Sequence, residues 1–167
     1  MKRPTPWAID LRELTALSVF AALMIAFQVA MAGLTNIEIV SLFIILATLH
    51  FGKKALLSVA VFVLAEGLIF GFHLWWISYC YVWPLLALLV LALKKWSHPL
   101  LWTVVGGLFG LLFGTLCSIP EFIAGGFGAG FGYIIAGIPY DLIHCLGNIV
   151  LIGLLFYPLE RLLQRIL

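Results

Sequence analysis

Long apolar runs follow one another along nearly the whole chain, separated only by short breaks that contain charged residues, glycine or proline. An α-helix needs about 20 residues to cross the hydrocarbon core of a bilayer. Most runs are close to this length, and the second run is the shortest. The pattern predicts an all-α membrane protein with six transmembrane helices in a single domain, residues 1–167. The predicted spans are residues 13–33, 37–52, 54–71, 75–93, 100–118 and 138–157.

The composition excludes a water-soluble globular domain. Hydrophobic residues make up 65% of the 167 residues and charged residues only 10%, whereas soluble domains have about 45–50% apolar and about 25% charged residues. Six spans with short connections use nearly the whole chain, so no separate catalytic or nucleotide-binding domain fits. The three cysteines lie in apolar runs without the spacing of a metal site, and we interpret them as packing residues.

The nine basic residues occur in groups that the predicted spans place on one side of the membrane. Because Lys and Arg concentrate in cytoplasmic connections, both ends of the chain are predicted to be cytoplasmic. A polar stretch before the first apolar run also favours a retained start over a cleaved signal peptide. The basic residues are Lys2, Arg3 and Arg12 before the first span, Lys53 and Lys54 after the second, Lys94 and Lys95 after the fourth, and Arg161 and Arg165 after the sixth.

Two predicted helices carry small residues at every fourth position, which places them on one helix face where another backbone can approach closely. We expect the glycine stripe of the fifth span to pack inside this bundle. The alanine stripe of the first span has two interpretations, which are internal packing and docking of another membrane subunit. The stripes consist of Ser18, Ala22, Ala26 and Ala30, and of Gly106, Gly110, Gly114 and Ser118.

The part of the chain predicted to face outside contains no Lys or Arg, but it holds acidic and polar side chains that are costly at membrane depth and by default face a cavity or a partner. Glu66, about two-thirds of the way across the third span, is either a site residue or a protonated carboxyl hydrogen-bonded inside the bundle. Asp141, His144 and Asn148 share one face of the sixth span. For Asp141 the alternative is a helix cap after Pro139. The polar residues of the outer part are Asn36, Glu38, Glu66, His73, Glu121, Asp141, His144 and Asn148.

Aromatic residues open the fourth predicted span, and a glycine-rich segment precedes the sixth. These aromatic residues are either interfacial anchors or rings on which a ligand stacks, and they are Trp75, Trp76, Tyr79, Tyr81 and Trp83. Residues 119–137 are predicted to form a long loop whose glycines suit a flexible cover over a pocket open to the outside.

Motifs of catalytic and nucleotide-binding sites are absent from the sequence. There is no G-x-x-x-x-G-K-[ST], so the chain has no phosphate-binding loop with which to hydrolyse ATP, and there is no H-E-x-x-H, G-x-S-x-G or metal-ligand cluster. We expect no enzymatic activity, no metal and no cofactor in this chain. The alternatives are a membrane enzyme that uses Glu66, Asp141 and His144 as acid and base, and a small assembly protein of the membrane.

Short motifs lie in a characteristic order along the chain: Ala22-x-x-x-Ala26, residues 36–41 (NIEIVS), residues 51–54 (FGKK), and residues 137–159, which begin GIPYDLIH and end YPL. Together with six spans and both ends inside, this order resembles the S components of energy-coupling-factor (ECF) transporters. S components are the substrate-binding membrane subunits of vitamin uptake systems. The resemblance covers nearly the whole chain, and its individual motifs are loose.

The resemblance implies a subunit of a prokaryotic plasma membrane that captures a vitamin from outside and works with a transmembrane coupling subunit and two ATPase subunits, which use the ATP. The family's small-residue motif contacts the coupling subunit, which implies docking at Ala22, Ala26 and Ala30. The family's pocket lies in the outer parts of the later helices. By position, the implied substrate-binding residues are Glu66, Trp75, Trp76, Tyr79, Tyr133, Asp141, His144 and Asn148.

The charges narrow the class of substrate. A vitamin held through a free carboxylate or phosphate favours Arg or Lys in its site, and the outer part of this chain offers neither. A glycine-rich cover and similarity to cobalamin-type S components favour cobalamin or another corrinoid. Pyridoxine, thiamin or its pyrimidine precursor, and queuosine precursors are the smaller alternatives. Lys2 stands where metal-specific relatives carry histidine, which disfavours nickel or cobalt ions.

Overall fold

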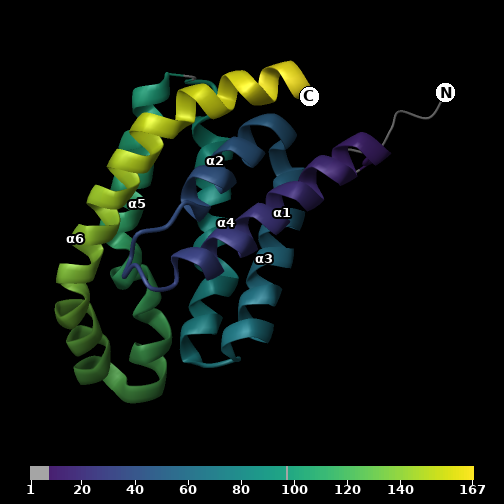
Figure 1. Ribbon diagram of the computed structural model, residues 1–167. Helices are drawn as coiled ribbons and strands as arrows, with labels where there is room; N and C mark the ends of the chain where they lie inside the picture. The colour runs from purple at the N-terminus through teal and green to yellow at the C-terminus, as the bar shows by residue number, and fades with distance from the viewer. Residues whose placement is uncertain (1–7, 97) are drawn as a thin grey trace.

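The computed structural model describes residues 8–96 and 98–167, and in this part of the chain it is helical without a strand. Lys2 and Arg3 of the predicted topology lie outside the described residues. Figure 1 shows the helices gathered into one bundle. The elements are α1 (Leu11–Met31), α2 (Val40–Phe51), a short 3-10 turn η1 (Gly52–Lys54), α3 (Ala55–Phe70), α4 (Leu74–Leu93), α5 (Pro99–Cys117) and α6 (Ile119–Ile166).

The short helix α2 forms the centre of the bundle. All residues from Val40 to Thr48 are buried, and α1, α3, α4, α5 and α6 each contact α2. A helix that is apolar all round belongs in a protein interior, where every face finds an apolar neighbour. The sequence of α2, rich in Leu and Ile, therefore specifies a core helix around which the others pack.

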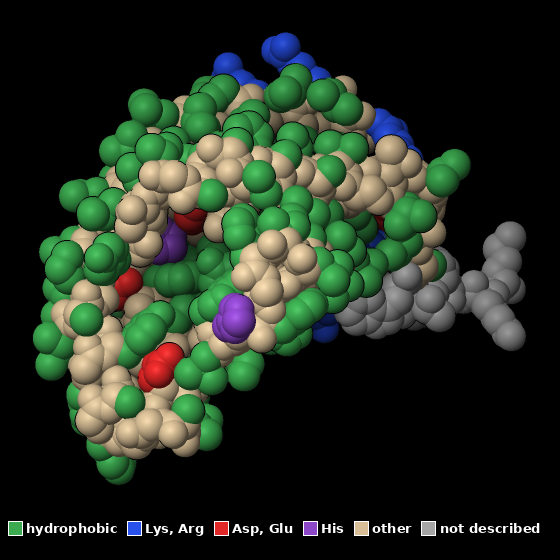
Figure 2. All heavy atoms as spheres, turned by 60° about the horizontal axis from the view of Figure 1, so that its bottom comes forward, with side chains coloured by type: hydrophobic (Ala, Val, Ile, Leu, Met, Phe, Trp, Pro, Cys, Tyr) green, Lys and Arg blue, Asp and Glu red, His purple; other side chains and the backbone are tan. Residues whose placement is uncertain are grey.

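Among the residues that the structure describes, four helices are long and apolar enough to cross a membrane: α1, α4, α5 and α6. With 12 and 16 residues, α2 and α3 are shorter. The bundle also presents large apolar side chains outward, among them Leu64, Leu88, Leu108 and Leu154, and Figure 2 shows hydrophobic side chains over much of the visible surface. An apolar exterior of this extent is typical of a protein surrounded by lipid.

Several basic residues gather at one end of the bundle. The α2–α3 turn, the α4–α5 connection and the last turns of α6 lie together at the top of Figure 1. The ion pair Lys54–Glu13 (2.6 Å) and the hydrogen bond between His50 and Glu160 (2.9 Å) tie helices together there. We call this the basic end; it carries Lys53, Lys54, Lys94, Lys95, Arg161 and Arg165.

The first helix begins where the sequence supplies a capping box. Asp10 accepts a hydrogen bond from the backbone N–H of Glu13 (2.8 Å), and the Glu13 carboxylate accepts one from the backbone N–H of Asp10 (3.3 Å). This reciprocal pair satisfies two backbone donors that the start of a helix leaves free. It sets the first helical residue at Leu11, slightly before the predicted span.

The predicted loop over residues 119–137 is wrong, because this segment is helical on both sides of a kink at Gly126, and the part after the kink continues into the sixth predicted span in α6. Only Gly126 departs from helical geometry, with φ 72° and ψ −170°, a conformation that glycine adopts without a Cβ clash. Phe122 packs against Phe131, with ring centroids 5.2 Å apart. A Cβ atom added to Gly130 would lie only 2.3 Å from ring atoms of Phe122. Gly130 therefore gives Phe122 room to pack.

The glycine stripe packs α5 against α6, as predicted. A Cβ on Gly106 would lie 2.1 Å from a methyl group of Ile152, and a Cβ on Gly110 would lie 2.8 Å from the backbone of His144. The absence of side chains at these positions brings the two helix backbones together. This close approach places Asp141, His144 and Asn148 of α6 directly beside α5.

Candidate functional site

A polar hollow of about 300 Å³, the central pocket, lies beneath the connection between α1 and α2. Figure 2 views the molecule with the end opposite the basic end turned forward; it shows a hollow with acidic and histidine side chains in its wall and no Lys or Arg at its rim. The lining residues are Gln28, Met31 and Ala32 of α1, residues 34–38 of the connection, Tyr79 and Trp83 of α4, Phe113 of α5 and His144 of α6.

The connection is held over the pocket by Asn36. Its side-chain amide donates a hydrogen bond to the backbone carbonyl of Tyr140 on α6 (3.2 Å). Asn36 has a positive φ of 55°, in the left-handed region that Asn tolerates better than most residues. The pocket is therefore formed by α1, α4, α5 and α6 together with the α1–α2 connection, which Asn36 attaches to α6.

Three aromatic rings form one wall of the central pocket. The ring centroids of Tyr79 and Trp83 are 5.4 Å apart, those of Trp83 and Phe113 are 5.3 Å apart, and those of Tyr79 and Phe113 are 6.2 Å apart. Phe113 also packs edge-on against the imidazole of His144, with centroids 4.9 Å apart. These contacts fix the rings by packing, so the wall exists before any ligand binds.

A buried acid–imidazole pair lies at the same pocket. Nε2 of His144 is 3.0 Å from Oε1 of Glu38, and the other carboxylate oxygen of Glu38 accepts a hydrogen bond from the backbone N–H of Ser41 (2.8 Å). The bond to Ser41 orients Glu38 at the start of α2, where the helix dipole favours a negative charge. The pair joins the start of α2 to α6 and places a carboxylate in the wall of the pocket.

Two buried polar atoms of pocket residues have no hydrogen-bond partner within the described residues: Nε1 of Trp83 and Nδ1 of His144. An unpaired buried polar atom costs about 1–3 kcal/mol, so each one calls for an explanation. Both residues line the central pocket.

Deeper in the bundle, Asn148 connects three helices. Its amide nitrogen donates to the backbone carbonyl of Gly106 on α5 (3.0 Å) and to the hydroxyl of Ser41 on α2 (3.4 Å). Asn148 is 1% exposed and lines neither pocket described here. Its role is to join α2, α5 and α6 beneath the Glu38–His144 pair.

We expect Asn148→Leu to lower the free energy of unfolding by about 1 kcal/mol, because interhelical hydrogen bonds between side chains in membrane proteins contribute about this much. Unfolding of the purified protein in mixed detergent micelles measures the change. Gln164→Leu is the control, since its amide bonds only Glu160 on the exposed end of α6 (2.9 Å); it should change stability by no more than a few tenths of a kcal/mol. Equal effects of the two variants would contradict this role of Asn148.

Asp141 faces a second hollow of about 290 Å³, the side pocket. It lies in the interior of α6, so the helix-cap interpretation is wrong; instead, its carboxylate accepts a hydrogen bond from the backbone N–H of Gly114 on α5 (2.8 Å). The side pocket shares Asn36 and Phe113 with the central pocket, so the two hollows adjoin. The lining residues of the side pocket are Asn36, Phe113, Gly114, Tyr133, Ala136, Gly137, Tyr140 and Asp141.

The structure distributes the predicted substrate-binding residues over several places. Tyr79 and His144 line the central pocket, and Tyr133 and Asp141 line the side pocket. Glu66 is 2% exposed and lines neither, so the acid and base of the alternative enzyme hypothesis do not share one pocket.

The two predicted tryptophans lie beside the pocket wall. The indole N–H of Trp76 donates to the backbone carbonyl of Val63 on α3 (2.8 Å), which ties α4 to α3. Trp75 packs edge-on against Tyr79, with centroids 4.9 Å apart. Neither lines the pockets described here, and both support the pocket residue Tyr79 and its helix.

Some pocket residues were not in the predicted set: Asn36, Glu38, Trp83 and Phe113. Glu38 carried a signal, since it is a carboxylate in a part of the chain without Lys or Arg. Phe113 carried none, because a phenylalanine within an apolar run has the pattern of any core residue.

The predicted docking residues lie on the outside of the bundle. Ala22, Ala26 and Ala30 are exposed on α1, and Ala22 lies beside α3 in an apolar groove between the two helices. The glycine stripe of α5, in contrast, is covered by α6. The exposure of these three alanines favours docking over internal packing, and docking stays a prediction.

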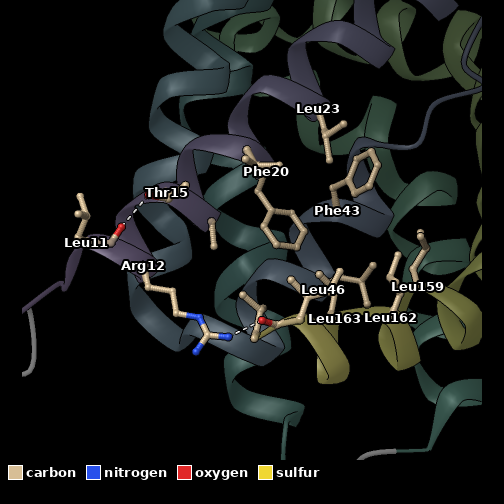
Figure 3. A pocket seen from close by; sticks show the side chains of 14 residues that line it. Leu11, Arg12, Thr15, Phe20, Leu23, Phe43, Leu46, Leu159, Leu162 and Leu163 are labelled. Atoms are coloured by element: carbon tan, nitrogen blue, oxygen red, sulfur yellow. Dashed lines mark hydrogen bonds between the residues drawn. The ribbon is translucent and has the colours of Figure 1, made fainter.

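An apolar groove of about 720 Å³ lies at the basic end, between the start of α1 and the end of α6. Figure 3 shows leucine and phenylalanine side chains from α1, α2 and α6 pointing into it, with Arg12 at its edge donating to the carbonyl of Ile166. Apart from Arg12 and Thr15 its lining is apolar. The groove therefore offers almost no hydrogen bonds to a polar substrate and is separate from the candidate site.

Comparison of the chain with family models, with curated proteins and with solved structures finds no match in any of the three. Within residues 8–96 and 98–167, no group of three or more His, Cys, Asp or Glu side chains is arranged to hold a metal ion.

Proposed function

We propose that this protein is the substrate-binding S component of an ECF-type transporter, with the central pocket as its vitamin site. The observation that carries the proposal is the position of this pocket: it lies among α4, α5, α6 and the α1–α2 connection, and it opens away from the basic end. The motif order along the chain supports the same assignment.

The proposed orientation follows from the charges. With the basic end toward the cytoplasm, as the positive-inside rule requires, the central pocket opens to the outside. All six helices then belong to the membrane domain, with α2 enclosed by the others. The pocket accepts its substrate outside, and the basic end meets the cytoplasmic partners.

The proposed partners are a transmembrane coupling subunit and two ATPase subunits. The chain has no phosphate-binding loop of its own, so energy must come from partners. The exposed stripe of Ala22, Ala26 and Ala30 on α1 is a surface where a partner helix can approach closely. We assign the coupling subunit to this surface.

The size of the pocket favours the smaller candidate substrates. A hollow of about 300 Å³, with an adjoining one of about 290 Å³, is at the lower end of the roughly 300–1,000 Å³ that enclose drug-sized ligands. A corrinoid macrocycle is much larger than such ligands. We therefore propose a small vitamin, neutral or cationic, ahead of cobalamin.

We expect one small vitamin to stabilise the purified protein in a saturable way, because a ligand that binds only the folded state adds about 2.7 kcal/mol at a concentration of 100 Kd. Thermal unfolding with pyridoxine, thiamin, its pyrimidine precursor, queuine and cobalamin measures this. Stabilisation by cobalamin alone would keep the transporter and reject the size argument. No response to any vitamin, together with no ATPase in a pull-down from the native membrane, would contradict the proposed function.

A further inference from the structure

The central pocket combines aromatic faces with a carboxylate. Tyr79, Trp83 and Phe113 form its wall, and Glu38 lies at the same pocket. Ring faces carry negative electrostatic potential and attract cations, most strongly where water is excluded. This combination of groups differs from that of a site for a purely apolar ligand.

The partners of Glu38 leave its carboxylate with spare capacity. An ionised carboxylate has about four acceptor sites. Glu38 uses two of them, one for the backbone N–H of Ser41 and one for a nitrogen of His144. Glu38 is only 8% exposed, and no Lys or Arg lines the pocket. The partner His144 carries a charge only when protonated. Beside a neutral His144 a buried carboxylate without a cation is costly, so a cationic ligand would complete its surroundings.

His144 is the neighbour that shares this carboxylate, with Nε2 3.0 Å from Oε1 of Glu38. A neutral imidazole that donates from Nε2 forms a hydrogen bond with Glu38 but brings no positive charge. In that form the charge of Glu38 is left for a cationic ligand to balance.

Resting on the proposed function, we propose that the substrate of the central pocket is an organic cation, a small ring or alkyl ammonium group held against the rings of Tyr79, Trp83 and Phe113 with Glu38 as its counter-charge. This narrows the class of neutral or cationic vitamins to its cationic members. It also assigns specificity to Glu38 and Phe113, which touch the ligand.

A series of probes that share one ring tests the charge preference directly. The probes are 1-methylnicotinamide, which is a cation, nicotinamide, which is neutral, and nicotinate, which is an anion; tetramethylammonium and thiamin extend the cations to smaller and larger sizes. We expect 1-methylnicotinamide to bind with a Kd at least about tenfold lower than that of nicotinamide, and nicotinate not to bind. Calorimetry on the full chain in detergent or nanodiscs measures each Kd.

Two variants separate the rings from the carboxylate. Phe113→Leu keeps an apolar side chain and removes a ring, so it should raise the Kd of 1-methylnicotinamide about fivefold and leave that of nicotinamide within twofold. Glu38→Gln should remove most of the preference for the cation. The matched control is Glu160→Gln, which alters the similar His50–Glu160 pair at the basic end (2.9 Å) and should leave both Kd values unchanged.

The outcomes distinguish this inference from the proposed function. Binding of a neutral vitamin without any preference for cations would overturn the cation site and leave the transport function in place. Selective binding of cations, without vitamin uptake and without ATPase partners, would keep the cation site and overturn the proposed transport function. If the protein unfolds cooperatively and none of the three cations binds to it, the cation site is overturned. If Glu38→Gln does not fold, Phe113→Leu gives the decisive comparison.

Discussion

Ala26→Trp is expected to abolish vitamin uptake while leaving the affinity for the substrate within twofold. Ala26 is exposed in the middle of the alanine stripe on α1 and does not line the central pocket. Helices that pack through small residues bring their backbones close together, and an indole at the contact forces them apart. The loss should therefore appear in the assembled transporter and not in the isolated subunit.

Two measurements on the same variant check this result: uptake of labelled vitamin by cells that also express the coupling and ATPase subunits, and ligand binding by the purified subunit. Ala92→Trp is the matched control, because Ala92 is also exposed but lies on α4; it should retain uptake. Uptake by the Ala26→Trp variant at the normal level would show that the coupling subunit docks elsewhere. Loss of binding as well would mean that α1 shapes the pocket instead.

Gly110→Ala is expected to lower the free energy of unfolding by about 3 kcal/mol. The added Cβ would lie 2.8–2.9 Å from backbone atoms of His144 and Cys145 on α6. Backbone atoms cannot rotate away as the end of a side chain can, so α5 and α6 must separate. Overpacking of a tight interior typically costs about 1–3 kcal/mol, and a clash with backbone belongs at the upper end.

The same substitution at Gly132 provides the control. Gly132 is within α6, and a Cβ there would meet no atom within 4 Å. Because alanine favours a helix by about 0.5–1 kcal/mol over glycine, Gly132→Ala should stabilise the protein slightly. Unfolding in mixed micelles compares the two variants, and similar stability of both would contradict the close packing of α5 on α6. Gly110→Ala should also weaken ligand binding, since His144 lines the central pocket.

The helices were largely predictable from the sequence, because their ends carry charge, Gly or Pro and their interiors are continuously apolar. The first five predicted spans each correspond to one helix within a few residues. Residues 119–137 were not predictable in this way. Glycine is frequent in loops, and the packing of Phe122 against Gly130 and Phe131, which accompanies the helical structure, is not visible in the local pattern.

The site was predictable in part. The spacing of Asp141, His144 and Asn148 correctly placed them on one face of a helix, and all three face α5 or α2. Their partners could not be predicted, because Glu38 and His144 are 106 residues apart in the chain. A pair so distant in sequence depends on how the helices pack, which no local pattern encodes.

The enclosed position of α2 has a consequence for how the protein is made. With 12 residues, α2 extends over about 18 Å, well short of the about 30 Å of a bilayer core. A nascent segment of this length cannot rest stably across the bilayer, and in the finished protein its buried face is turned to other helices, not to lipid. We therefore expect the insertion machinery to handle α2 and α3 as one hairpin, with Lys53 and Lys54 left on the side of synthesis, so that biogenesis of the middle of the chain proceeds by pairs of helices.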